Sequence, residues 1–106
     1  MSETIIFTQH QKFLPPLELV WLTGTEMGKR FPLTGERQTF GRSQNNDIVF
    51  ADQTISDRHG VLVYTGEGVL FYDTASKNGI SVDGKKAQTI TLKPGQQIQI
   101  GSVYLK

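Results

Sequence analysis

Residues 40–79 read FGRSQNNDIVFADQTISDRHGVLVYTGEGVLFYDTASKNG, and this stretch decides the fold of the chain. Short apolar or alternating runs in it are separated by small polar clusters and glycines. At its centre, the runs GVLVYT (60–65) and VLFYD (69–73) flank Gly66-Glu67-Gly68. Glycine supplies the positive φ that a tight turn needs, so the two runs are predicted to form a β-hairpin.

Runs of the same kind continue on both sides of this hairpin. We expect further strands at 17–23, 30–33, 38–42, 48–50, 80–82, 89–92, 97–100 and 103–105, with turns at Asp83-Gly84 and Pro94-Gly95. No long window shows a clean helical period, and the runs recur roughly every eight to twelve residues. The sequence therefore predicts an all-β fold, a β-sandwich or barrel with no substantial helix.

The length of 106 residues fits one domain. Residues 1–16 are expected to form an N-terminal arm or linker, because Pro15-Pro16 disfavours both a helix and a central strand. An extra edge strand at 4–7 is the alternative. The β-domain is expected over 17–106. The chain ends directly after an apolar alternation, which suggests a fragment of a longer protein.

Composition limits the classes of function. The formal net charge is only +1, so no general nucleic-acid-binding or membrane-surface face is expected. The chain has no cysteine, which excludes disulfides and thiolate metal sites. No apolar run approaches the roughly 20 residues of a membrane span, and no signal peptide is visible. We expect a soluble, intracellular and monomeric domain without metal or cofactor.

Three polar clusters follow apolar or alternating runs, and loops at one end of a sandwich can converge however far apart they lie in sequence. The clusters are Gly41-Arg42-Ser43, Ser56-Asp57-Arg58-His59 and Ser76-Lys77-Asn78-Gly79. Together they offer hydrogen-bond donors to an anion and little chemistry for making or breaking bonds. The planar guanidinium of Arg42 matches a phosphate or carboxylate. Lys77 adds positive charge, and the Asn78 amide can bracket a peptide backbone.

The spacing of Ser56 and His59, with Asp57 between them, does not predict a catalytic site. A triad needs a base that is oriented by a third group in three dimensions, and residues crowded into four consecutive positions rarely achieve this. A neutral His59 imidazole can instead donate to one backbone group and accept from another, which would hold two loops together. Residues 79–86, GISVDGKK, approach a phosphate-loop pattern but end in lysine and lack the following helix. No catalytic residue is predicted.

In their order along the chain, the clusters resemble the motifs of the forkhead-associated (FHA) family. The matching motifs are Gly41-Arg42, Asn46-Asp47-Ile48, Ser56 to His59, and Ser76 to Gly79 leading to Asp83-Gly84. The segment LKPGQQIQIGS, residues 92–102, is similar to the ending of the family pattern. The resemblance covers about residues 17–106.

This resemblance implies an FHA/SMAD-like β-sandwich of about eleven mostly antiparallel strands that binds phosphothreonine in a partner protein or peptide. The candidate phosphopeptide-binding residues are Arg42, Ser43, Ser56, Arg58, Lys77 and Asn78. Gly41, His59 and Gly79 are expected to shape the loops. The implied function is non-catalytic protein–protein interaction, as one domain of a larger signalling or regulatory protein.

Asp57 departs from the family pattern, which often has Arg, Lys or Asn at this position. A carboxylate beside a phosphate lowers affinity by like-charge repulsion. Either the side chain turns away from the site, with Arg58 as a candidate partner, or the domain binds weakly or without phosphate. A phosphate-independent scaffold or assembly domain with the same fold is therefore the alternative function.

Overall fold

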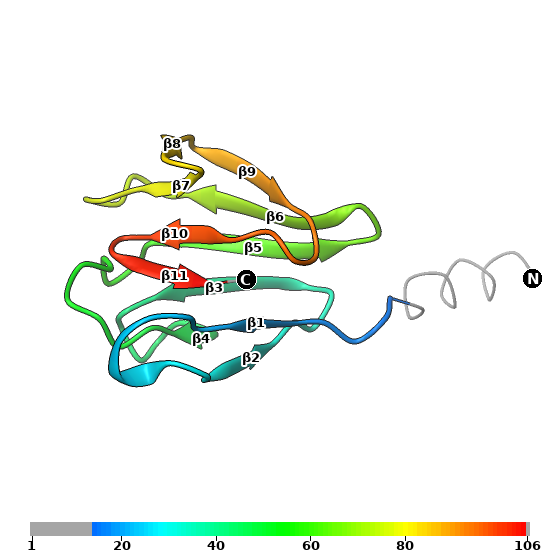
Figure 1. Cartoon of the computed structure of the whole chain (residues 1–106), viewed down its shortest axis with the longest axis horizontal. Helices are drawn as coiled ribbons and strands as arrows, with labels where there is room; N and C mark the ends of the chain where they lie inside the picture. Colours follow the sequence, from blue (N-terminus) through cyan, green and yellow to red (C-terminus); the bar gives the residue numbers. More distant parts are fainter. Residues whose placement is uncertain (1–13, 106) are drawn as a thin grey trace, which may run out of the picture.

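A computed structural model describes residues 14–105 and is drawn in Figure 1. This part of the chain forms eleven strands and one short 3-10 turn. They are β1 (Glu18–Val20), η1 (Gly24–Glu26), β2 (Arg30–Pro32), β3 (Arg37–Gly41), β4 (Ile48–Val49), β5 (Gly60–Thr65), β6 (Gly68–Asp73), β7 (Ile80–Val82), β8 (Lys85–Lys86), β9 (Thr89–Leu92), β10 (Ile98–Ile100) and β11 (Val103–Leu105). The all-β prediction is confirmed. Most of the predicted arm, with the alternative strand at 4–7, lies outside the described residues.

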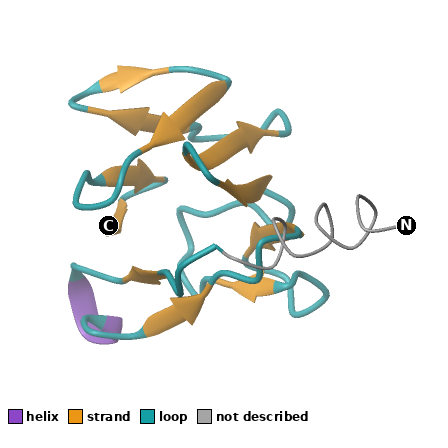
Figure 2. Cartoon of the chain, turned by 90° about the vertical axis from the view of Figure 1, so that its right-hand side faces the viewer, coloured by secondary structure: helices purple, strands orange, loops and turns teal. Residues whose placement is uncertain are grey.

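The strands are arranged in three sheets. One has the order β4-β3-β5-β6-β9, the second β11-β10-β7-β8, and the third is the β1–β2 hairpin. Within residues 14–105 the β3–β4 pair is parallel and the other strand pairs are antiparallel. A single bridge between Trp21 and Leu105 links the hairpin to β11. Figure 2 shows the layers of strands with their connecting loops gathered at the edges.

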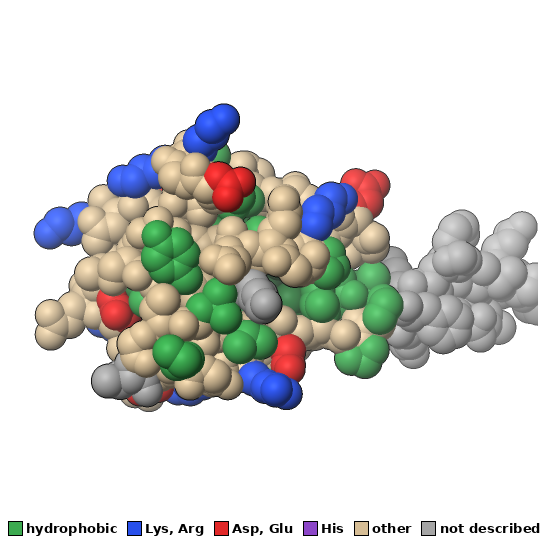
Figure 3. All heavy atoms as spheres, in the orientation of Figure 1, with side chains coloured by type: hydrophobic (Ala, Val, Ile, Leu, Met, Phe, Trp, Pro, Cys, Tyr) green, Lys and Arg blue, Asp and Glu red, His purple; other side chains and the backbone are tan. Residues whose placement is uncertain are grey.

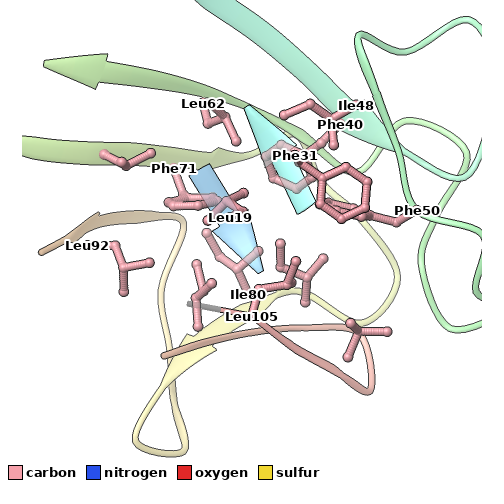
Figure 4. Close-up of a cluster of buried hydrophobic side chains, with 14 of the residues drawn as sticks. Leu19, Phe31, Phe40, Ile48, Phe50, Leu62, Phe71, Ile80, Leu92 and Leu105 are labelled. Atoms are coloured by element: carbon pink, nitrogen blue, oxygen red, sulfur yellow. The ribbon is translucent and has the colours of Figure 1, made fainter. Parts of the chain in front are cut away.

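Buried side chains alternate with more exposed ones along the strands of the five-stranded sheet, so one face of the sheet points to the core. In β5, Leu62 is 0% and Tyr64 8% exposed, and in β6 Phe71 is 0% exposed. Their inner side chains pack with residues of the other sheets into one hydrophobic core, part of which is drawn in Figure 4. The rings of Phe40 and Phe71 meet edge to face at 5.8 Å between centroids. Burial of such side chains is the main stabilising term of the fold.

Several predicted strands differ from the structure by one residue at an end, and two differences are larger. The predicted strand at 17–23 is reduced to β1. Trp21 keeps backbone hydrogen bonds to Lys29 and Gly28 and also forms a bridge with Leu105, and the N–H of Leu22 then donates to Tyr104 of β11. The two-residue strand β8 was not predicted, because a pair of exposed lysines has no apolar alternation. β8 pairs with β7 at the edge of its sheet, where lysine discourages pairing with another chain.

The register of the central strands brings the three polar clusters to one end of the sandwich. Phe40 at the end of β3 pairs with Gly60 at the start of β5, and Gly60 pairs with Asp73 at the end of β6. The loops that follow β3, precede β5 and follow β6 therefore start side by side. They lie at the left of Figure 1.

The face drawn in Figure 3 shows no single dominant charge. On the face drawn in Figure 3, Lys and Arg side chains stand at separate points near the outline, with Asp or Glu near some of them. This distribution agrees with the formal net charge of +1. Among residues 14–105, no helix has the length and apolar character needed to cross a lipid bilayer.

Candidate functional site

Backbone hydrogen bonds join the β3–β4 and β4–β5 loops. The N–H of Arg42 donates to the carbonyl oxygen of Ser56 at 3.0 Å, and the N–H of Ser43 donates to that of Asp57 at 3.2 Å. The side-chain amide of Asn46 donates to the carbonyl oxygens of Ser43 at 2.8 Å and Asp57 at 2.7 Å. The first two polar clusters are thus one hydrogen-bonded unit.

Gly41 permits this close approach of the two loops. A Cβ atom built at Gly41 would lie 2.3 Å from the carbonyl oxygen of Asp57 and 2.9 Å from Nδ2 of Asn46. Real Cβ atoms do not approach a backbone oxygen so closely, so a larger residue would push the loops apart. The glycine before Arg42 is required by packing, since its φ is not in the left-handed region.

His59 connects the β4–β5 loop to the β6–β7 loop. Its Nδ1 accepts a hydrogen bond from the Ser56 N–H at 3.1 Å, so the ring proton is on Nε2, which donates to the Gly79 carbonyl oxygen at 2.9 Å. The ring is fully buried and stacks on Phe40 with 5.9 Å between centroids. Because both nitrogens are bonded to backbone groups, neither is free to serve as a base for the Ser56 hydroxyl.

The Ser56 side chain lies between the second and third clusters. Its Oγ accepts a hydrogen bond from the backbone N–H of Lys77 at 3.0 Å. This bond uses an oxygen lone pair, so the hydroxyl hydrogen remains available to a ligand. Lys77 is exposed. The turn after it is closed by Ser76, whose Oγ accepts from the N–H of Gly79 at 2.9 Å, and Gly79 itself has a φ of 75°.

The Asn78 side chain is half-buried and fixed by one hydrogen bond to the β4–β5 loop. Its Nδ2 donates to the carbonyl oxygen of Thr54 at 2.7 Å. Within residues 14–105 the carbonyl oxygen Oδ1 of Asn78 forms no hydrogen bond, and Nδ2 has a second hydrogen. A fixed amide with one free acceptor and one free donor is suited to an extended peptide backbone.

Arg42 forms an ion pair with Asp57, from Nε to Oδ1 at 3.2 Å. The Arg42 side chain is 45% exposed and the Asp57 side chain 71% exposed. Arg58, suggested from the sequence as the partner of Asp57, does not fill that role. The bond uses only one of the five guanidinium N–H groups, so both Nη groups of Arg42 can still meet an anion.

Arg58 and Ser43 differ in position from the other candidate binding residues. Arg58 lines a separate pocket of about 270 Å³ with Arg37 of β3 and Thr74 after β6. The Ser43 Oγ accepts from the N–H of Asn45 at 3.2 Å and so supports its own loop. The structure therefore brings together Arg42, Ser56, Lys77 and Asn78, and it places Arg58 beside this group.

Two supporting residues were not identified as such from the sequence. Asn46 was noted only within a family motif, although asparagine in a turn often bonds to nearby backbone. Thr54 donates locally to Asp52 from its N–H and its hydroxyl, but the contacts that support the site are with residues far along the chain. Its carbonyl oxygen accepts from Asn78, and its Oγ1 lies 2.9 Å from Oγ of Ser102. Among residues 14–105, no three His, Cys, Asp or Glu side chains are grouped to hold a metal ion.

Known proteins resemble this chain in both sequence and fold. The model of the family described as "Inner membrane component of T3SS, cytoplasmic domain" matches residues 21–106. The oxoglutarate dehydrogenase inhibitor of Corynebacterium jeikeium is 34% identical over 87 residues, which cover 82% of this chain and 60% of that protein. The curated relatives that we compared are covered over 9% to 61% of their length, so the chain spans less than two thirds of each.

Solved structures agree over most of the chain. The FHA domain of the CT664 protein from Chlamydia trachomatis has a TM-score of 0.77 and 30% identity, covering 86% of this chain and 94% of that one. A structure from a study of phosphothreonine-dependent FHA domain interactions has a TM-score of 0.76 and 25% identity, covering 86% and 93%. Fold and loops together define a β-sandwich domain with a polar site at one end. The chain belongs to the forkhead-associated (FHA) family.

Proposed function

We propose that this domain binds phosphothreonine in partner proteins and thereby mediates protein–protein interaction without catalysing a reaction. The observation that carries the proposal is the position of Ser56. Its carbonyl oxygen is bonded to the backbone of Arg42 and its Oγ to the backbone of Lys77. One hydroxyl is therefore held between the chain segments that carry two cationic side chains.

The chemistry of these groups fits a phosphorylated side chain. Phosphothreonine carries about −1.5 to −2 charge and three strong acceptor oxygens at neutral pH. The Nη groups of Arg42, the hydroxyl of Ser56 and the ammonium of Lys77 supply charge-assisted or neutral donors. The amide of Asn78 would bind the peptide main chain. With both nitrogens of His59 bonded to backbone groups, this imidazole has no free nitrogen to act as a base.

The test is a titration of phosphothreonine peptides and their unphosphorylated twins against wild type, Arg42→Ala and Arg37→Ala. Arg37→Ala is a matched control, because it removes the same charge from the neighbouring pocket. We expect micromolar binding, on the order of −8 kcal/mol, to phosphorylated peptides only. Loss of the Arg42 contacts should weaken it by about ten- to a hundredfold. Equal binding by wild type and Arg42→Ala would refute the proposal.

A phosphate-independent scaffold is the second candidate, and the Arg42–Asp57 ion pair favours it. In that case Arg42 would stay paired with Asp57 and would not bind phosphate, and a sheet face would bind the partner. Inorganic phosphate distinguishes the two functions by NMR. Shifts of the amide signals of Ser56, Lys77 and Asn78 support phosphate recognition, whereas shifts or self-association elsewhere, with these three signals unmoved, support the scaffold.

We also propose that the folded unit over 17–106 acts as a monomeric, intracellular domain of a larger signalling or regulatory protein. In support, the chain covers only part of each curated relative that we compared, and the matching family model is described as a cytoplasmic domain. A sedimentation experiment with residues 17–106 tests the monomer, and a dimer at micromolar concentration would contradict it.

A further inference from the structure

We infer that Asp57 selects phosphothreonine peptides that carry a lysine or arginine beside the phosphothreonine. The inference rests on the proposed function and names the class of peptide that the same site takes. Asp57 follows Ser56 directly, and its carbonyl oxygen is held by the Ser43 N–H and by the Asn46 amide. Its carboxylate is therefore attached to a braced backbone at the margin of the site.

The charges of the site do not balance those of the ligand. Arg42 and Lys77 contribute +1 each and Asp57 contributes −1, so the group sums to +1. A phosphothreonine carries about −1.5 to −2. These three residues therefore leave about 0.5 to 1 negative charge uncompensated when the site is occupied. Arg58 lies in the neighbouring pocket with Arg37, and a cationic side chain on the peptide itself would neutralise the remainder.

Asp57 has a free oxygen with which to bind such a cation. Its Oδ1 faces Nε of Arg42, whereas its Oδ2 forms no hydrogen bond or ion pair within residues 14–105. The side chain is 71% exposed, so a second partner can approach from solvent without breaking the ion pair. A carboxylate accepts about four hydrogen bonds, and one is used here.

Other carboxylates of these loops each use one oxygen to accept from a backbone N–H. Asp47 accepts from the N–H of Thr39, and Asp73 accepts from the N–H of Ser76. Asp57 is instead paired only with a side chain that the phosphate would also bind. Since one residue of extended chain spans at most about 3.6 Å, a basic residue within two positions of the phosphothreonine can reach this carboxylate.

The experiment compares matched phosphothreonine peptides with lysine or glutamine at each position from two before to two after the phosphothreonine. Wild type, Asp57→Asn and Glu67→Gln are titrated at about 0.1 M salt and again at higher salt. Glu67→Gln removes the same charge from the β5–β6 turn, roughly 16 Å along β5 from the site and beyond the screening length of about 10 Å.

At one position or more, we expect wild type and Glu67→Gln to bind the lysine peptide about three- to tenfold more tightly than its glutamine twin. Asp57→Asn should reduce this preference to less than about twofold, and added salt should weaken it in wild type. A preference that survives in Asp57→Asn, or phosphopeptide binding without any preference for lysine, overturns the inference and leaves the proposed function standing. No binding of any phosphothreonine peptide overturns both.

Discussion

Substitution of His59 separates two ways in which one buried ring stabilises the domain. His59→Asn keeps a side-chain oxygen near the position of Nδ1, where it can still accept from the Ser56 N–H, but it loses the donor to the Gly79 carbonyl oxygen. His59→Ala loses both hydrogen bonds and the packing of the ring on Phe40. The two variants should therefore differ in stability by more than side-chain size suggests.

The magnitudes follow from what each backbone group retains. The Gly79 carbonyl oxygen still accepts from the Gly101 N–H at 3.3 Å, so loss of the Nε2 bond alone costs about 0.5–1.5 kcal/mol. The Ser56 N–H has no second acceptor among the described residues, and an unsatisfied donor there costs about 1–3 kcal/mol. Loss of the buried ring adds about 1 kcal/mol. We expect His59→Asn to cost about 1–2 kcal/mol and His59→Ala about 3–5 kcal/mol.

Urea unfolding followed by the fluorescence of Trp21 measures these costs, because Trp21 is 2% exposed in the folded state. A small domain has about 5–15 kcal/mol of stability in total, so at low temperature both variants should still show a folded-state baseline in the urea unfolding curve. Phosphopeptide affinity should fall in His59→Asn, since one of the hydrogen bonds that tie the turn containing Asn78 to the β4–β5 loop is lost, while those from Lys77 to Ser56 and from Asn78 to Thr54 remain. Equal destabilisation by the two substitutions, or a cost below about 1 kcal/mol for alanine, would refute the two-bond account.

Two further predictions concern the loops. Gly41→Ala should lower the free energy of unfolding by about 3 kcal/mol, because its Cβ would meet the carbonyl oxygen of Asp57. Gly66→Ala, with no atom within 4 Å of its Cβ, should change it by less than about 0.5 kcal/mol. Urea unfolding measures both, and similar costs would contradict the packing role of Gly41. Asn78→Ala should weaken phosphopeptide binding about tenfold but cost only about 1 kcal/mol of stability, because the Thr54 carbonyl oxygen loses one donor. Calorimetric titration measures the affinity and urea unfolding the stability. Unchanged affinity would show that Asn78 does not contact the peptide.

The sequence predicted best those strands whose limits depend on local chemistry. The bounds of β5, β7, β9 and β11 agree with prediction, because alternation in or beside them stops at glycine or other turn residues. β1 was predicted too long, because the run LVWLT continues to Thr23, whereas the backbone N–H of Leu22 donates to Tyr104 of β11 and not across the hairpin. This change of partner depends on tertiary contacts with Tyr104 and Leu105, and no residue near Trp21 signals it.

The sequence could predict which loops meet at the site, but not which charged side chains pair there. Antiparallel register places the end of β3, the start of β5 and the end of β6 together, so residues that follow or precede those strands must be neighbours. Which charges meet depends instead on two backbone hydrogen bonds, from the Arg42 N–H to Ser56 and from the Ser43 N–H to Asp57. These bonds lay the two loops alongside each other and bring Arg42 and Asp57 into contact.

The mistaken pairing of Asp57 with Arg58 illustrates this dependence. Asp57 and Arg58 lie in a turn of the β4–β5 loop, where nearness in sequence does not decide which charged side chains meet. Asp57 faces Arg42, fifteen residues away, while Arg58 turns to the pocket beside Arg37. The Asp57 carboxylate, which from the sequence should weaken phosphate binding, is therefore paired with the Arg42 guanidinium. Its second oxygen is the basis of the proposed preference for a basic residue beside the phosphothreonine.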